Sequence, residues 1–350
     1  IAITGYQGIK AFEDAANQSQ RTDPVAGRKD IDGYQAAVWN AAVPAALRYD
    51  PKTNPKGARP TVFDEAHNVY GVNAATGAAL RTYDNVGVQY GLSALNAGVI
   101  TPAQFIELNQ KVGGVDQDDN YTETRAVGDA GAMKRAYQSG LMLSTKGGLA
   151  NIPVFDNATK REEAGYHYGW FDFALRDRFR EANGNSDNLV IWRNTTPAAL
   201  TAVFDKWMVA YVSDKNPGTQ REKVLRNKPA EATEGCYDKS TPARFVVESL
   251  IFSSKPVSKC SEMFPVYSNP RHEAGGPLAA NVFKCQLKSI DAKDYKVPMS
   301  ANDIATLKQV FQGGVCDFTK PGVSQTPVVT WASFGPNPNN VIFDAAKSTN

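Results

Sequence analysis

Three histidines and the carboxylates near them are the side chains of this sequence best suited to acid–base chemistry. They are His67, His167 and His272. An imidazole has a reference pKa of about 6.5, which lets it take and return a proton at neutral pH. His167 closely follows Asp156, and a carboxylate that orients an imidazole is the arrangement that a serine-type catalytic triad needs. Asp156 and His167 are therefore the candidate acid–base pair, with His272 as the alternative base.

The attacking group of such a triad is missing from the sequence. No GxSxG-type elbow occurs in the 350 residues. The sequence also has no GxGxxG, Walker or HExxH motif, so neither a nucleotide nor a redox cofactor is implied. The chain thus offers the orienting acid and the base of a triad without its nucleophile.

The segment that carries Asp156 and His167 has the pattern of strand, loop, helix and strand. An apolar run over residues 152–155 ends on Asp156, a helix is expected over about residues 170–182, and a second apolar run covers residues 189–192. This order is typical of a parallel sheet covered by helices. Functional groups in such sheets sit on the loops that leave the carboxyl ends of strands. We expect Asp156 and His167 to share one such loop.

Other segments predict further elements. Helices are expected over residues 84–97, from 102 to about 112, over 130–139, over 195–214 with Thr196 as its cap, and over 301–311. Residues 213–234 are polar and predict a surface linker, whereas residues 243–253 predict a strand. The first part of the chain, residues 1–145, is expected to be helices and loops.

Four cysteines, all in the last third of the chain, indicate disulfides. They are Cys236, Cys260, Cys285 and Cys316, and no two form the CxxC pair that is typical of a zinc site. Four buried thiols would be the alternative. We expect two disulfides and hence an extracytoplasmic protein. Of the three connectivities we favour neighbour pairing, Cys236 with Cys260 and Cys285 with Cys316.

An acidic turn offers oxygen ligands at alternate positions, Asp116, Asp118 and Asn120. This spacing resembles a loop that wraps calcium. The glycine expected at the sixth position of such a loop is Tyr121, however. A solvated acidic turn is the favoured interpretation, and a structural calcium ion is the minority one.

The composition excludes several classes of partner. The chain is 42% hydrophobic and 21% charged, with a formal net charge of +2 and no basic run, which argues against nucleic acid. No apolar stretch is long enough to span a bilayer. The N-terminus lacks the charged and apolar regions of a signal peptide, although a mature chain could have lost one.

Several blocks of this sequence resemble a family of secreted bacterial proteins of alpha/beta-hydrolase type, distantly similar to tannases and feruloyl esterases. The blocks are DNVGVQYGLSALNAGVITPAQFIELNQKVGG, NIPVFD with GYHYGWFDFALRDRFREANG, NVFKCQLK and FQGGVCDFTKPGV. The family's chains are longer, and the resemblance covers their C-terminal half. It implies that residues 1–145 are a helical cap (lid), that Asp156 is the triad acid, and that His167 is the best match to the family's histidine.

One feature departs from the usual alpha/beta-hydrolase order. The histidine of that fold follows the last strand, which here would be residues 189–192, but residues 193–197 contain no histidine. Either the base lies on the loop after Asp156, as His167, or His272 returns to the site from the tail. A third reading is that the chain is not catalytic in this way.

Two functions follow as hypotheses. In the first, residues 146–214 form the late strands and helices of a secreted ester hydrolase, residues 215–350 form a disulfide-stapled extension, and an N-terminal segment or partner chain supplies the serine. In the second, the chain is a non-catalytic extracellular binding or assembly protein on a hydrolase-like scaffold. Five aromatic residues would then form a ligand-facing patch, although core packing is their more ordinary use: Tyr166, Tyr168, Trp170, Phe171 and Phe173.

Overall fold

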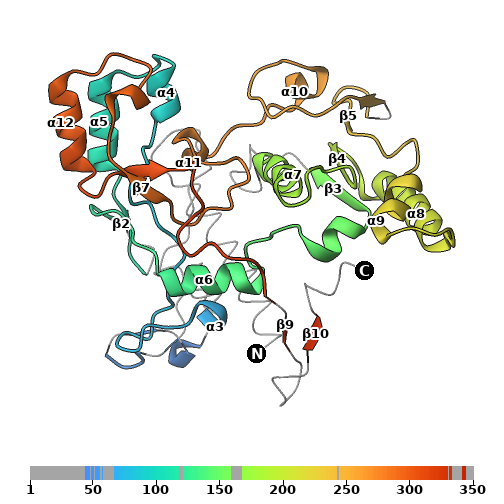
Figure 1. Cartoon of the computed structure of the whole chain (residues 1–350), viewed down its shortest axis with the longest axis horizontal. Helices are drawn as coiled ribbons and strands as arrows, with labels where there is room; N and C mark the ends of the chain where they lie inside the picture. Colours follow the sequence, from blue (N-terminus) through green and yellow to red (C-terminus); the bar gives the residue numbers. More distant parts are fainter. Residues whose placement is uncertain are drawn as a thin grey trace. The chain divides into compact units, whose positions relative to one another are not determined.

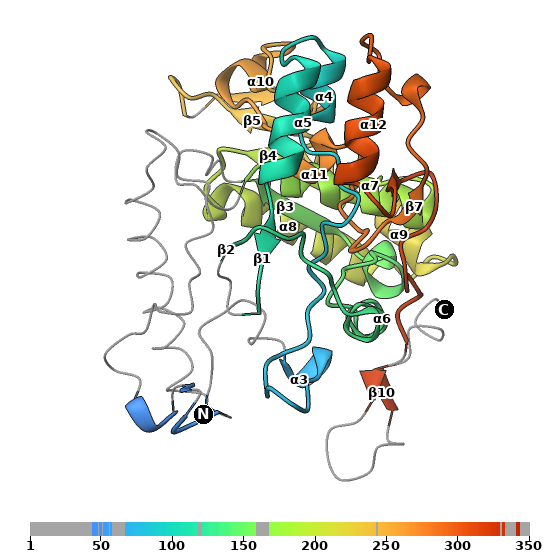
Figure 2. The same ribbon diagram turned by 90° about the vertical axis from the view of Figure 1, so that its left-hand side faces the viewer.

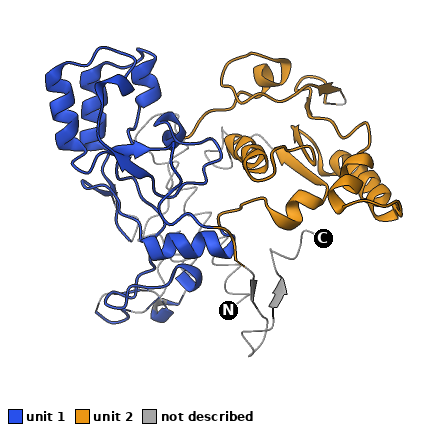
Figure 3. Ribbon diagram, viewed as in Figure 1, with its two compact units in different colours: residues 1–141, 270–326 blue, residues 142–269, 327–350 orange. Residues whose placement is uncertain are grey.

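The computed structural model shows a mixed α/β protein that divides into two compact units. Figure 1 draws the chain with its elements labelled, and Figure 2 shows it turned by 90°. Unit 1 comprises Ile1–Leu141 and Pro270–Thr326, and unit 2 comprises Met142–Asn269 and Pro327–Asn350 (Figure 3). The structure describes residues 44–47, 49–50, 52–55, 57, 67–117, 121–158, 168–242, 244–329, 331–332 and 341–343.

Unit 2 contains a four-stranded sheet with the order β3, β4, β5 and β6. The strands are β3 (Val154–Ala158), β4 (Leu189–Arg193), β5 (Gly235–Tyr237) and β6 (Phe245–Val247). β3 and β4 are parallel, as are β4 and β5, whereas β6 is antiparallel to β5. Every residue of β4 is buried, as expected for a parallel strand covered on both faces. The expected parallel pairing is confirmed, within a sheet that also has an antiparallel strand.

One face of this sheet packs on the helices α8 (Pro197–Ser213) and α9 (Gln220–Arg226). Val190 and Trp192 of β4 join Trp207 of α8 and Val224 of α9 in one buried cluster. Phe155 of β3 packs edge-on against Trp207, with ring centroids 6.0 Å apart. The predicted helix over residues 195–214 is confirmed. Thr196 caps it, because the Thr196 hydroxyl accepts a hydrogen bond from the Ala199 amide.

The opposite face of the sheet carries the remaining side chains of β3 and β4. Side chains alternate along a strand, so Asp156 points away from the face that holds Phe155. Asp156 is paired in register with Ile191, and Ala158 with Arg193, which places Arg193 on the same face as Asp156. Helix α7 (Trp170–Asn183) reaches this face, because its first turn hydrogen-bonds to Asp156.

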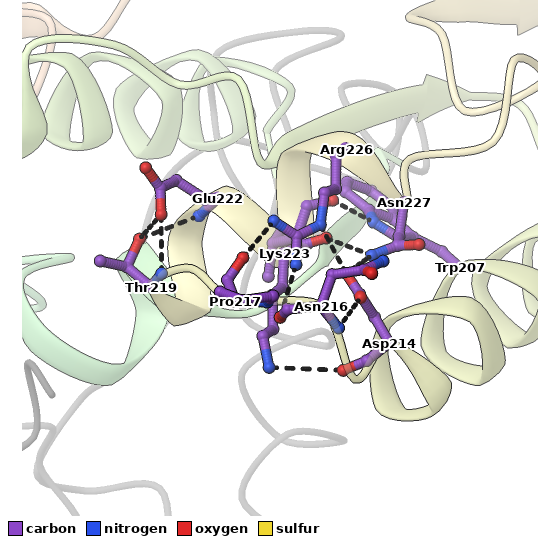
Figure 4. Close-up of polar contacts among 10 residues, drawn as sticks. Trp207, Asp214, Asn216, Pro217, Thr219, Glu222, Lys223, Arg226 and Asn227 are labelled. Atoms are coloured by element: carbon purple, nitrogen blue, oxygen red, sulfur yellow. Dashed lines mark hydrogen bonds and ion pairs between the residues drawn. The ribbon is translucent and has the colours of Figure 1, made fainter.

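The prediction of a polar linker over residues 213–234 is wrong, because helix α9 lies within it. Thr219 and Glu222 form a capping box at its start. Asp214 ties the end of α8 to α9: its Oδ2 accepts hydrogen bonds from Arg226 Nε at 2.6 Å and from Asn227 Nδ2 at 2.7 Å (Figure 4). The hydrogen bond from Arg226 lowers the pKa of Asp214. The segment is polar in composition but is fixed by these contacts.

Unit 1 is built around two helices that lie side by side in both ribbon views, α5 (Pro102–Lys111) and α12 (Ala301–Val310) (Figures 1 and 2). Both begin with capping boxes, Thr101 with Gln104 and Ser300 with Asp303. Their apolar sides share one core cluster with Tyr295. These two helices and α6 (Ala130–Ser139) are confirmed predictions.

The helix predicted over residues 84–97 forms only in part, as α4 (Leu92–Asn96). The residues before it are a buried irregular segment held by side chains. Arg125 donates to the carbonyl oxygens of Asn85 at 3.2 Å and Val88 at 3.0 Å. The Asp84 carboxylate, 1% exposed, binds Lys284 Nζ at 2.6 Å. The Arg125 side chain thus satisfies backbone carbonyl groups that a helix would have paired internally.

The two disulfides are those predicted from the sequence. Cys236–Cys260 lies in unit 2, and Cys285–Cys316 lies in unit 1. The predicted strand over residues 243–253 is reduced to β6. Among the residues that the structure describes, no helix is both long and apolar enough to cross a membrane.

The shorter elements complete the two units. Those of unit 1 are η1 (Ala45–Leu47), α3 (His67–Tyr70), β1 (Gly114–Val115), β2 (Tyr121–Thr122), α11 (Pro270–Glu273), β7 (Gln286–Lys288), η4 (Ala292–Asp294) and β8 (Val315–Asp317). Those of unit 2 are η2 (Gly147–Asn151), α10 (Lys259–Met263), β9 (Trp331–Ala332) and β10 (Val341–Phe343). β7 and β8 form an antiparallel pair, as do β1 and β2.

Candidate functional site

Asp156 lies inside β3, and not on the loop that the sequence analysis expected. The strand begins at Val154 and runs on to Ala158. Its five-residue parallel ladder with β4 continues past Asp156, so backbone pairing, and not the end of the apolar run, sets where the strand stops. The Asp156 carboxyl group therefore projects from a fixed strand position, between the sheet and the start of α7.

The environment of Asp156 disfavours its charge. Burial raises the pKa of Asp156 to about 6, and a side-chain hydrogen bond with Asp172 offsets part of that rise. Asp172 lies in the first turn of α7. The site thus contains two carboxyl groups in direct contact, one from a strand and one from a helix.

Two buried arginines lie on the same side of the sheet as this carboxyl pair. Arg176 is one helical turn after Asp172 on α7, and its Nη1 binds Glu234 at 3.1 Å and the Leu250 carbonyl at 2.9 Å. Arg193, the last residue of β4, is 1% exposed and donates from Nη1 to the Phe264 carbonyl at 2.8 Å. Both guanidinium groups therefore bind segments of unit 2 that follow β4 in the sequence.

The candidate base cannot be placed next to Asp156. His167 lies outside the described residues, so its pairing with Asp156 stays a prediction. His272 is described and belongs to helix α11 of unit 1, whereas Asp156 belongs to unit 2. His272 Nδ1 lies 2.8 Å from the Gly276 carbonyl oxygen. Because a carbonyl only accepts, Nδ1 carries the hydrogen there, and in the neutral ring Nε2 is the basic nitrogen.

The aromatic segment around His167 has two uses in the structure. Phe173 is buried and packs against Phe252, with ring centroids 5.7 Å apart. Trp170 and Phe171 stack on each other at 3.9 Å, and Phe171 is 50% exposed. Tyr166 lies outside the described residues. One aromatic ring of the segment is therefore core, and a stacked pair stands at the start of α7 with one ring in solvent.

The calcium expectation is not tested by the structure. Asp116 follows strand β1 and is half-buried, but Asp118 and Asn120 lie outside the described residues. β1 and β2 pair in antiparallel register, with Val115 opposite Tyr121, so Asp116 comes directly after a residue of this strand pair. Within the described ranges no group of three metal-ligating side chains occurs.

Sequence reasoning missed Asp172, Arg176 and Arg193 as parts of this site. The spacing of Asp172 and Arg176 on the predicted helix was a usable signal, because residues four apart share a helix face. Arg193 at the end of an apolar strand was another. Nothing in the sequence showed that Asp172 faces Asp156, because that contact depends on how α7 packs on the sheet.

The comparisons with known proteins give one positive result. A family model described as a tannase-like family of unknown function (DUF6351) matches residues 1–327. No curated protein and no solved structure matches the chain. The match spans both compact units and includes Asp156, Asp172, His167 and His272. This chain therefore belongs to the tannase-like family DUF6351.

Proposed function

We propose that this chain is part of a secreted serine-type hydrolase that cleaves carboxylic esters. The observation that carries the proposal is membership of a tannase-like family over residues 1–327, since tannases are esterases. The parallel strands β3 and β4 with covering helices support an alpha/beta-hydrolase core. Two disulfides support secretion, because such bonds persist in oxidising compartments.

Asp156 is the proposed triad acid, and His167 is the proposed base. The Asp156 carboxylate accepts the Nδ1–H of His167 and holds the imidazole in the tautomer whose Nε2 can take a proton. His272 is the alternative base. Residues 1–145 would form a cap (lid), residues 146–214 the catalytic part of the core, and residues 215–350 the stapled extension.

The nucleophile is proposed to come from an N-terminal segment or a partner chain, because the 350 residues contain no GxSxG motif. Its serine Oγ attacks the ester carbonyl while His167 takes the hydroxyl proton and passes it to the departing alcohol. Water then cleaves the acyl-enzyme by the same route, and backbone amides of the partner stabilise the oxyanion. The substrate class is a small or polymeric ester.

The first prediction tests this mechanism on the purified assembly with a small chromogenic ester. Asp156→Asn should lower kcat by about 10⁴-fold, by analogy with serine proteases, because the imidazole loses its orienting acceptor. His167→Ala should remove nearly all turnover. His67→Ala is the matched control and should be close to neutral, and circular dichroism checks that each variant folds.

The histidine variants also separate the two candidate bases. If His272→Ala abolishes turnover while His167→Ala spares it, the base is on α11 and the assignment of His167 fails. A fluorophosphonate probe should label a serine on the polypeptide that accompanies this chain. An assembly with no labelled serine and no turnover would favour the binding-protein alternative, for which the exposed Phe171 stacked on Trp170 is a contact surface.

A further inference from the structure

We propose that the outer edge of strand β6 binds the same edge of a second copy of this chain, so that the two four-stranded sheets join into one continuous sheet. The outer edge is the side of β6 that faces away from β5. This inference goes beyond the proposed function and does not depend on it, because it concerns the association of unit 2 and uses no group of the candidate site.

The hydrogen bonds between β5 and β6 show which backbone groups of β6 face outwards. The Asp238 amide donates to the Arg244 carbonyl oxygen at 2.8 Å, and the Glu248 amide donates to the Glu234 carbonyl oxygen at 3.2 Å. Alternate residues of an antiparallel strand bond to the same neighbour. Val246, midway between Arg244 and Glu248, therefore also bonds towards β5.

Phe245 and Val247 thus direct their N–H and C=O groups away from β5. β6 is the last strand in the sheet order. Among the residues that the structure describes, neither residue has a backbone hydrogen bond on this outer side. The Val247 side chain is 66% exposed. Such an edge can accept a further strand, and neither lysine nor proline occurs in β6 to prevent it.

The sequence of this edge fits an antiparallel copy of itself. Arg244 precedes β6 and Glu248 follows it. A two-fold axis at Val246 sets Arg244 of each copy opposite Glu248 of the other, and opposite charges across an antiparallel pair stabilise it. The same register sets Phe245 opposite Val247, so that their outward groups form about four backbone hydrogen bonds. Shifting the axis to Phe245 or Val247 loses both charge pairs.

Contacts within unit 2 hold the Glu248 carboxylate in place beside this edge. Its Oε1 accepts hydrogen bonds from the Ser258 hydroxyl at 2.5 Å and from the Cys260 amide at 2.9 Å. The disulfide Cys236–Cys260 joins the same segment to β5. A side chain that is fixed before association loses less entropy on binding. Because Glu248 also holds α10, the test changes Arg244 instead.

The size of the contact predicts a weak and reversible dimer. β6 has three residues, so the paired strands bury less area than a standard stable interface. We expect a dissociation constant in the micromolar range or weaker. Sedimentation velocity of the purified chain from about 1 to about 200 μM should show the average mass rise towards that of a dimer. Monomer at every concentration would overturn the proposal, and so would growth beyond the dimer, because a two-fold contact closes on itself.

Two substitutions in and beside β6 test the contact, with one matched control. Arg244→Glu sets like charges opposite each other at both ends of the pair and should raise the dissociation constant by about tenfold in low salt. Val247→Lys adds a charge to the edge and should act in the same direction. The control is Val209→Lys, since Val209 is 58% exposed on α8, and it should leave the dissociation constant unchanged.

Circular dichroism checks that each of these variants folds. A dissociation constant that neither β6 variant raises would overturn the proposal. An equal rise in Val209→Lys would do the same, because the effect would then belong to any added surface charge.

Hydrogen exchange of single amides, measured by mass spectrometry with fragmentation, tests the register. The Val246 amide bonds to β5 in monomer and dimer alike, so its exchange should not change with concentration. The Phe245 and Val247 amides face outwards and should exchange more slowly at high concentration. If these two amides exchange at the same rate at low and high concentration, the edge pairing is wrong, even for a chain that dimerises through another surface.

Discussion

Asp156 shows how one residue couples the chemistry of the site to the stability of the chain. Its pKa is raised from 3.8 to about 6, chiefly by burial. The folded chain therefore binds this proton more tightly than the unfolded chain does. The free energy of unfolding should therefore fall as the pH rises from about 4 to about 6. Over this window the unfolded chain has released the proton of Asp156, whereas the folded chain still holds it.

A second prediction, the pH dependence of unfolding, follows from this shift. The loss across the window is on the order of 3 kcal/mol at most, from a shift of about two pKa units. Asp156→Asn should flatten this part of the stability curve, because it removes the titrating group. Urea unfolding at several pH values between 4 and 7 measures it, with Asp177→Asn as control. If Asp156→Asn leaves the slope of unfolding free energy against pH unchanged, a group other than Asp156 causes the pH dependence.

At the scale of elements, the predictions from sequence were most accurate for helices whose first residues carry an N-cap signal. Thr196 followed by Pro197, and Thr101 followed by Pro102, located the starts of α8 and α5. Such signals are local, since the capping side chain bonds to amides within three residues. The parallel strands were also visible as short apolar runs, although β3 extends past the run that predicted it.

The elements that sequence reasoning missed depend on distant partners. Residues 84–90 have a helical pattern, but the Arg125 guanidinium binds the carbonyl oxygens of Asn85 and Val88 in place of helical amides. Helix α9 has one fully buried apolar side chain, Val224, so its periodicity was too weak to detect. The contact between Asp156 and Asp172 belongs to the same class, because it joins a strand to a helix. Charge and spacing alone do not reveal such contacts.

Helix α9 supplies a third prediction, on its capping box. Thr219→Ala should destabilise the chain by about 1 kcal/mol, because the Thr219 hydroxyl no longer accepts from the Glu222 amide. Chemical denaturation followed by tryptophan fluorescence is suitable, since Trp207 donates to the Val224 carbonyl at 2.8 Å. The exposed Thr201 of α8 provides the control, as Thr201→Ala. Equal effects of the two changes would show that the cap contributes nothing specific.

At the scale of the whole molecule, each compact unit has its own disulfide. Cys236–Cys260 spans 24 positions and Cys285–Cys316 spans 31. Loop-closure entropy gives about 3–4 kcal/mol for each bond. Removing one of them should therefore weaken one unit more than the other.

The fourth prediction is a unit-specific loss of protection. Hydrogen exchange followed by mass spectrometry should show faster exchange in α5 and α12 for the double variant Cys285→Ala with Cys316→Ala. The variant Cys236→Ala with Cys260→Ala should instead affect β4 and α8. Each variant serves as the control for the other. Uniform acceleration across both units in either variant would mean that the units unfold together.

The division into units also sets an order on biosynthesis. Unit 1 consists of two stretches of chain with most of unit 2 between them. The buried Asp84 is synthesised 200 positions before Lys284, its ion-pair partner. All four strands of the unit 2 sheet leave the ribosome in that interval, and domains generally fold as units during synthesis. The sheet that contains Asp156 should thus fold first. The N-terminal part of unit 1 should stay incompletely folded, with Asp84 not yet paired with Lys284, until the last quarter of the chain has been synthesised. Chaperones could bind the chain during this interval.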